Sequence, residues 1–70
     1  MKEVIVNQVY KWRAKSGITQ EALAGAVGVT RQTIIAIEKG NYTPSVVLAL
    51  KISSFFGKPL EEVFQIKYSN

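Results

Sequence analysis

Residues 17–40, with the sequence GITQEALAGAVGVTRQTIIAIEKG, decide the fold of this 70-residue chain. The stretch contains two amphipathic segments, and Gly28 separates them. Thr19 and Thr30 each precede one segment, and a threonine hydroxyl can cap a helix by accepting a hydrogen bond from a free backbone N–H. Gly28 can adopt the positive φ that a tight turn requires. The stretch therefore predicts two short helices joined by a tight turn, over about 19–39.

The first of these predicted helices, over 19–27, has one apolar side. Leu23, Ala24 and Val27 recur at helical spacings and therefore share a face. Glu21 lies in the first turn, where the helix dipole favours a negative charge. Because Ala24 is small, it lets the neighbouring helix approach closely.

The second predicted helix, over 30–39, divides sharply into two sides. Ile34 and Ile37 form the inward side, and Gly40 follows as a left-handed residue that ends the helix. The outward side carries polar and small residues, namely Arg31, Gln32, Thr33, Ala36 and Lys39.

Three further helices are predicted around this pair. A first helix over 7–16 ends at Gly17 and turns Val9 and Trp12 inward. A fourth helix follows Ser45 as its N-cap, ends at Gly57 and has as its predicted inward residues Val46, Ala49, Leu50, Ser53 and Phe56. A short fifth helix takes Pro59 as its first position and closes onto the core through Val63 and Phe64. The predicted fold class is all-α, a compact five-helix bundle.

The two ends of the chain leave alternatives open. Residues 2–6 and 64–68 both tend to alternate and are rich in β-forming residues. They can pair as a small terminal β ribbon, within one chain or between two chains. They can equally form a helix extension and a frayed tail.

The composition narrows the classes of function. Nine Lys and Arg against five Asp and Glu give a net charge of +4, which suits an anionic partner without establishing one. The chain has no Cys and no His, which excludes a disulfide framework and a Cys/His zinc site. Those are also the commonest nucleophiles and general bases at neutral pH, so we expect neither an enzyme nor a metal or cofactor site. No apolar run approaches the length of a membrane span or of a signal-peptide core. We expect a single cytoplasmic domain over residues 1–70.

Two short helices joined by a glycine-containing turn, the second with a polar outward side, are the outline of a helix-turn-helix. In this motif the first helix crosses the DNA backbone and the second lies in the major groove. The pattern therefore favours double-stranded DNA as the partner, with the helix 30–39 as the reading element.

The chain also resembles a known family at specific places. The runs TQEALA (19–24), VGVTRQTI (27–34), IEKG (37–40) and Pro44-Ser45 are together similar to the XRE (Cro/phage-repressor type) helix-turn-helix family. The similarity covers residues 7–64 and points to the minimal bacterial members. The resemblance implies a lambda-repressor-like bundle that binds a palindromic operator as a homodimer and regulates transcription, usually as a repressor.

The resemblance also implies roles for individual residues. Gln20 matches a glutamine that contacts phosphate and can also reach a base, and Ala36 can meet a thymine methyl. Thr30 caps its helix and can bond phosphate. The complete set of implied DNA-binding residues is Gln20, Thr30, Arg31, Gln32, Thr33, Ala36, Lys39 and Asn41, with Tyr42 as a weaker candidate.

Arg13 and Glu38 match an internal ion pair that ties the first helix to the third. The chain departs from the family pattern at Ile35, where many relatives carry a small or polar residue, and at Trp12, where leucine is common. Ile35 can touch thymine methyls or cover a neighbouring core residue.

Apolar residues that a single inward face cannot accommodate are candidates for subunit contacts. They are Val47, Phe55, Ile66 and Tyr68. The alternative function is a protein-interaction module, such as an antitoxin or anti-repressor, in which the surface around Val47 and Phe55 covers a partner protein.

Overall fold

Short helices account for most of the chain. The computed structural model describes residues 2–69, in which five helices follow one another: α1 (Val9–Ser16), α2 (Gln20–Val27), α3 (Arg31–Glu38), α4 (Val46–Phe55) and α5 (Leu60–Val63). None of these helices is long and apolar enough to cross a membrane. The predicted number and order of helices are confirmed.

Side-chain caps start three of the helices, as predicted. The hydroxyl of Thr19 accepts a hydrogen bond from the backbone N–H of Ala22 at 3.0 Å, and the hydroxyl of Ser45 accepts one from Leu48 at 3.2 Å. Thr30 caps α3 in the same way. These bonds span only three residues, so the local sequence is sufficient to place each helix start.

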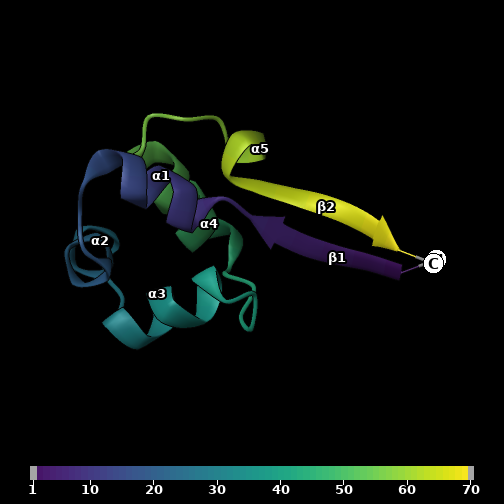
Figure 1. The fold of residues 1–70 in the computed structure, drawn as a ribbon, viewed down its shortest axis with the longest axis horizontal. Helices are drawn as coiled ribbons and strands as arrows, with labels where there is room; N and C mark the ends of the chain where they lie inside the picture. The colour runs from purple at the N-terminus through teal and green to yellow at the C-terminus, as the bar shows by residue number, and fades with distance from the viewer. Residues whose placement is uncertain (1, 70) are drawn as a thin grey trace.

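The two ends of the chain pair with each other, so the fold is not purely α-helical. Strands β1 (Lys2–Asn7) and β2 (Phe64–Ser69) form an antiparallel ribbon in which Lys2 pairs with Ser69 and Asn7 with Phe64. Figure 1 shows this ribbon projecting from one side of the helical bundle. The ribbon forms within one chain, and the alternative of a helix extension and a frayed tail is wrong. Because Asn7 belongs to β1, α1 begins at Val9 rather than at residue 7.

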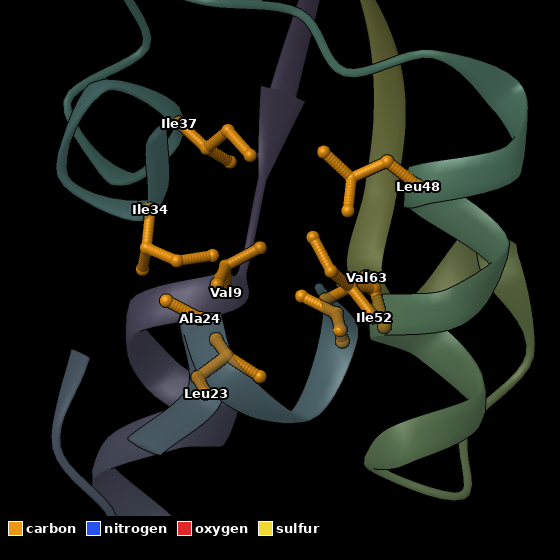
Figure 2. Packing of buried hydrophobic residues seen from close by; sticks show 9 residues of the cluster. Val9, Leu23, Ala24, Ile34, Ile37, Leu48, Ile52 and Val63 are labelled. Carbon is orange, nitrogen blue, oxygen red and sulfur yellow. The ribbon is translucent and has the colours of Figure 1, made fainter. Parts of the chain in front are cut away.

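The core receives side chains from all five helices. Figure 2 shows residues of α3 and α4 facing each other across the core, with α1 and α2 between them. Burying each Val, Leu or Ile contributes roughly 1.5–3 kcal/mol, so the burial of Ile34 and Ile37, mainly against α2, holds α3 firmly by its inner side. The buried cluster comprises Val9, Leu23, Ala24, Val27, Ile34, Ile37, Leu48, Ile52 and Val63.

The predicted inward face of α4 is partly wrong. Ala49 and Ser53 are buried and Phe56 packs against the core, but Val46 and Leu50 are 71% and 49% exposed. Leu48 and Ile52 occupy the core in their place. Seven of the ten residues of α4 are apolar, so hydrophobicity alone does not separate Val46 and Leu50 from Leu48 and Ile52. The buried hydroxyl of Ser53 donates to the carbonyl oxygen of Ala49 at 2.9 Å, which satisfies it inside the helix.

The short helix α5 begins one residue later than predicted. Pro59 is its N-cap, with ψ of 152°, and the first helical residue is Leu60. Val63 is fully buried, and Phe64 begins β2 while packing against the core. The helix therefore turns the chain from α4 into the ribbon.

Candidate nucleic-acid interface

The turn between α2 and α3 depends on one glycine. Gly28 has φ of 79°, a left-handed conformation that disfavours any residue with a Cβ. In this conformation the backbone N–H of Val29 donates to the carbonyl oxygen of Ala24 at 3.0 Å, which closes the end of α2. The chain can then enter α3 within three residues.

The two sides of α3 differ in exposure. Ile34 and Ile37 are fully buried, whereas Arg31 and Gln32 are exposed in the first turn. Lys39 is exposed just beyond the last turn. The outward side is less uniformly exposed than predicted, because Thr33 and Ala36 are half-buried. Ile35, which departs from the family pattern, is half-buried as well. The polar start of α3 is therefore available to a partner, while its apolar side anchors it.

Thr30 and Thr33 form a small cap at the start of α3. The hydroxyl oxygen of Thr30 accepts a hydrogen bond from the Thr33 backbone N–H at 3.3 Å, and the two hydroxyl oxygens lie 3.2 Å apart in a further hydrogen bond. These bonds orient the first turn of α3, which carries Arg31 and Gln32.

A partly buried ion pair joins α1 to α3. The guanidinium of Arg13 donates from Nε to Oε2 of Glu38 at 2.7 Å and from Nη2 to Oε1 at 3.2 Å. Its Nη1 donates to the carbonyl oxygen of Ile18 at 3.0 Å. The hydrogen bonds and the charge of Glu38 raise the pKa of Arg13 above its ordinary value, against the opposing effect of burial. The pair therefore ties α1, the loop before α2 and the end of α3 together.

Gln20 joins the same network. Its side-chain Nε2 donates to Oε1 of Glu38 at 3.0 Å, so the first residue of α2 is linked to the last residue of α3. Gln20 also borders a polar hollow of about 490 Å³ that it shares with Arg31. The remaining residues that line this hollow are Arg13, Thr19 and Glu21.

The other implied contact residues lie beyond the far end of α3. Lys39, Asn41 and Tyr42 are exposed, and Gly40 turns the chain there with φ of 79°. An eight-residue helix is about 12 Å long, so this group is separated from Arg31 by roughly that distance. The structure thus places implied residues at both ends of α3, with Ala36 between them and Gln20 on α2 beside the helix.

One residue that supports α3 was not predicted. The side-chain Nδ2 of Asn7 donates to the carbonyl oxygen of Ile37 at 2.9 Å, and its Oδ1 accepts from the backbone N–H of Val9 at 3.1 Å. Asn7 therefore connects the ribbon, α1 and the last turn of α3. An asparagine just before a helix signals a cap, but a partner 30 positions away leaves no sequence signal.

The candidate subunit-contact residues are all exposed but lie over two different places. Val47 and Phe55 are on α4, and Phe55 lines a hollow between α4 and α2. Ile66 and Tyr68 are on β2, and Ile66 lines an apolar groove at the base of the ribbon.

Comparisons with known proteins place this geometry in a family. A family model described as helix-turn-helix matches residues 9–63. The chain is 52% identical over 64 residues to the uncharacterized HTH-type transcriptional regulator YgzD of Bacillus subtilis (strain 168), covering 91% of this chain and 97% of that protein. It is 31% identical over 58 residues to the cryptic phage CTXphi transcriptional repressor RstR of Vibrio cholerae, covering 83% of this chain and 52% of the repressor.

A solved structure agrees with these sequence relatives. The restriction-modification controller protein C.AhdI from Aeromonas hydrophila superposes with a TM-score of 0.73 at 27% identity, covering 79% of this chain and 80% of that chain. The resemblance inferred from residues 19–45 is thereby confirmed. The chain belongs to the XRE-type helix-turn-helix family of transcriptional regulators.

Proposed function

We propose that this protein binds double-stranded DNA sequence-specifically by inserting α3 into the major groove, and that it represses transcription. The observation that carries the proposal is the exposure of Arg31 and Gln32 at the start of a helix whose opposite side is fully buried. Arg pairs with guanine O6 and N7, and Gln with adenine N6 and N7. A rigidly held helix that presents these two side chains is suited to read bases. The 31% identity to RstR, whose name is that of a transcriptional repressor, supports repression rather than activation.

The two groups of residues at the ends of α3 suit the two backbones that flank a groove. The polar hollow beside Gln20 and Arg31 is a site for a phosphate of one strand, and the helix dipole at the start of α2 favours an anion there. Lys39 and Asn41 can bind phosphates about one helix length away. Thr30 and Thr33 keep the first turn of α3 in place, and Ala36 offers a methyl to thymine.

We propose that residues 7–64 carry this DNA-binding fold as one domain, with the helix-turn-helix over 19–39, and that the protein works in the cytoplasm beside the DNA it binds. One such domain contacts few base pairs, so selectivity calls for a homodimer on a palindromic operator. Two-fold related recognition helices would read half-sites roughly 34–36 Å apart.

Of the two candidate subunit surfaces, we favour the one at the ribbon. Ile5 and Ile66 are paired across the strands, and both line the mainly apolar groove, whose other lining residues are Leu60, Glu61, Phe64 and Gln65. Tyr68 extends the same side of β2, because alternate residues of a strand share a face. The surface of Val47 and Phe55 on α4 is the second candidate.

Selection of bound sequences from a random duplex pool, at two salt concentrations, tests the proposal. We expect an enriched palindrome and an affinity that falls steeply as salt rises, because bound phosphates release counterions. The alternative function, an antitoxin or anti-repressor, predicts a different result. In that case no sequence is enriched, and the protein forms a stoichiometric complex with another protein through Val47 and Phe55.

A further inference from the structure

Glu38 holds the side chain of a DNA-contact candidate as well as its ion-pair partner. Its carboxylate accepts hydrogen bonds from Arg13 through both oxygens and from Gln20 through Oε1. The Glu38 side chain is only 6% exposed. We propose that Glu38 is a positioning residue for DNA reading, because it fixes the Gln20 amide in one orientation at the start of α2. This inference rests on the proposed function.

The chemistry of the amide determines that orientation. A glutamine amide has two N–H donors on Nε2 and one acceptor oxygen, whereas an ionised carboxylate only accepts. The 3.0 Å bond therefore requires Nε2 to face Glu38. If the amide rotated by half a turn, two acceptor oxygens would face each other at that distance. A glutamine on an open surface has no such constraint and can present either end.

The carboxylate is itself prevented from turning. The guanidinium of Arg13 donates hydrogen bonds to both carboxylate oxygens of Glu38. The same guanidinium also donates to the carbonyl oxygen of Ile18, two residues before Gln20. Arg13 and Glu38 are thus a rigid support shared by the loop before α2 and the end of α3. Rotation of the Gln20 amide would therefore break its hydrogen bond to a carboxylate that cannot turn to follow it.

The held amide keeps one N–H and its oxygen for a partner. One donor and one acceptor on a planar amide are the groups that pair with N7 and N6 of adenine. The Gln20 side chain is also ordered before it binds, which lowers the entropy cost of fixing it on DNA. Glu38 therefore favours an adenine at the base that Gln20 reaches, in addition to any phosphate contact.

Nuclear magnetic resonance on the free protein tests the first half of this inference without DNA. We expect the side-chain amide of Gln20 to be about as rigid as ordered backbone, with an order parameter near 0.85. In a double variant that carries Arg13→Met and Glu38→Met, we expect the value to fall below about 0.6. Replacing both partners avoids leaving a lone buried charge, so this variant should fold, and thermal unfolding checks that it does. Glu38→Gln, whose side chain has almost the same shape as that of Glu38, is a second variant for the same measurement. A mobile Gln20 amide in the wild-type protein would overturn the inference.

Selection of bound duplexes tests the second half. In Gln20→Ala and in the double variant, the preference for adenine over other bases should fall about five- to tenfold, at the same position of the site in both. A protein that combines the changes should show no further loss. A merely structural Glu38 would lower thermal stability and leave base preference unchanged, which contradicts the inference. If Gln20→Ala keeps the wild-type preference while Gln32→Ala changes it, the inference fails and the proposed function stands. If the wild-type protein selects no sequence at all, the proposed function fails, and a role of Glu38 in DNA reading fails with it.

Discussion

Arg31 is the residue on which the proposed base recognition depends most directly. It is exposed in the first turn of α3 and shares the polar hollow with Gln20. We expect Arg31→Ala to relax base preference at one position of each half-site, at a cost of about 1–3 kcal/mol for the preferred base. Competition between duplexes that differ at that position measures the loss. Lys15→Ala removes the same charge from α1 and serves as the control. Equal preference in Arg31→Ala and wild-type protein would show that α3 does not dock by its first turn.

Lys39 should contribute affinity without selectivity. It lies beyond the last turn of α3, where a phosphate is closer than a base edge in the proposed docking. We expect Lys39→Ala to weaken binding to all duplexes by a similar factor and to reduce the slope of affinity against salt by about one unit. Titrations at three or more salt concentrations, on the selected site and on an unrelated duplex, measure both effects. A loss confined to the selected site would instead mean that Lys39 reads a base.

From the residue pattern alone, single residues were predictable where their partners are close along the chain, whereas the Arg13–Glu38 pair, 25 positions apart, came only from the family resemblance. The Thr30 cap involves a residue three positions away, and the exposure of Arg31 and Gln32 follows from the burial of Ile34 and Ile37 on the same helix. The bond between Gln20 and Glu38 spans 18 positions and was missed. Such a bond depends on how α2 and α3 cross, which no local pattern specifies.

At the scale of elements, Gly25 inside α2 and Gly28 at its C-cap provide a matched test of the turn. Apart from the chain neighbours and the helix's own backbone, no atom of the described residues lies within 4 Å of a Cβ built at Gly25 or Gly28, so neither glycine is needed for space inside the chain. Of these two glycines, only Gly28 has a positive φ.

We expect Gly28→Ala to destabilise the fold by about 1–2 kcal/mol, the cost of a left-handed alanine. We expect Gly25→Ala to stabilise it by roughly 0.5–1 kcal/mol, because alanine is the better helix former. Denaturant unfolding of both variants measures the difference, and equal effects would mean that the turn is not strained by a Cβ.

Whole elements were predictable to different degrees. Helix ends follow from caps and glycines, which act locally, so the five helices were anticipated almost to the residue. The facing of α4 was not, because Val46 and Leu50 are as apolar as Leu48 and Ile52 and only packing against the other helices selects between them. The ribbon stayed an open alternative because Asn7 and Phe64 must meet across almost the whole chain.

At the scale of the molecule, the ribbon surface is the proposed subunit contact. We expect Ile66→Lys to convert the proposed homodimer to a monomer, because it puts a charge in the apolar groove beside Leu60 and Phe64. Ile66 is 53% exposed, so the folded chain should tolerate the change. Sedimentation equilibrium measures the oligomeric state, and Phe55→Lys on α4 is the matched variant. If Phe55→Lys dissociates the dimer and Ile66→Lys does not, the contact lies on α4 instead.

The central claim is that the polar side of α3 enters a DNA groove. Chemical-shift mapping by nuclear magnetic resonance, during titration with the selected duplex, tests it most directly. We predict that the largest changes occur at Gln20, in the first turn of α3 and at Lys39 and Asn41, while the core and the far end of α4 change little. Shifts concentrated around Val47 and Phe55, with Arg31 and Gln32 unaffected, would contradict the account.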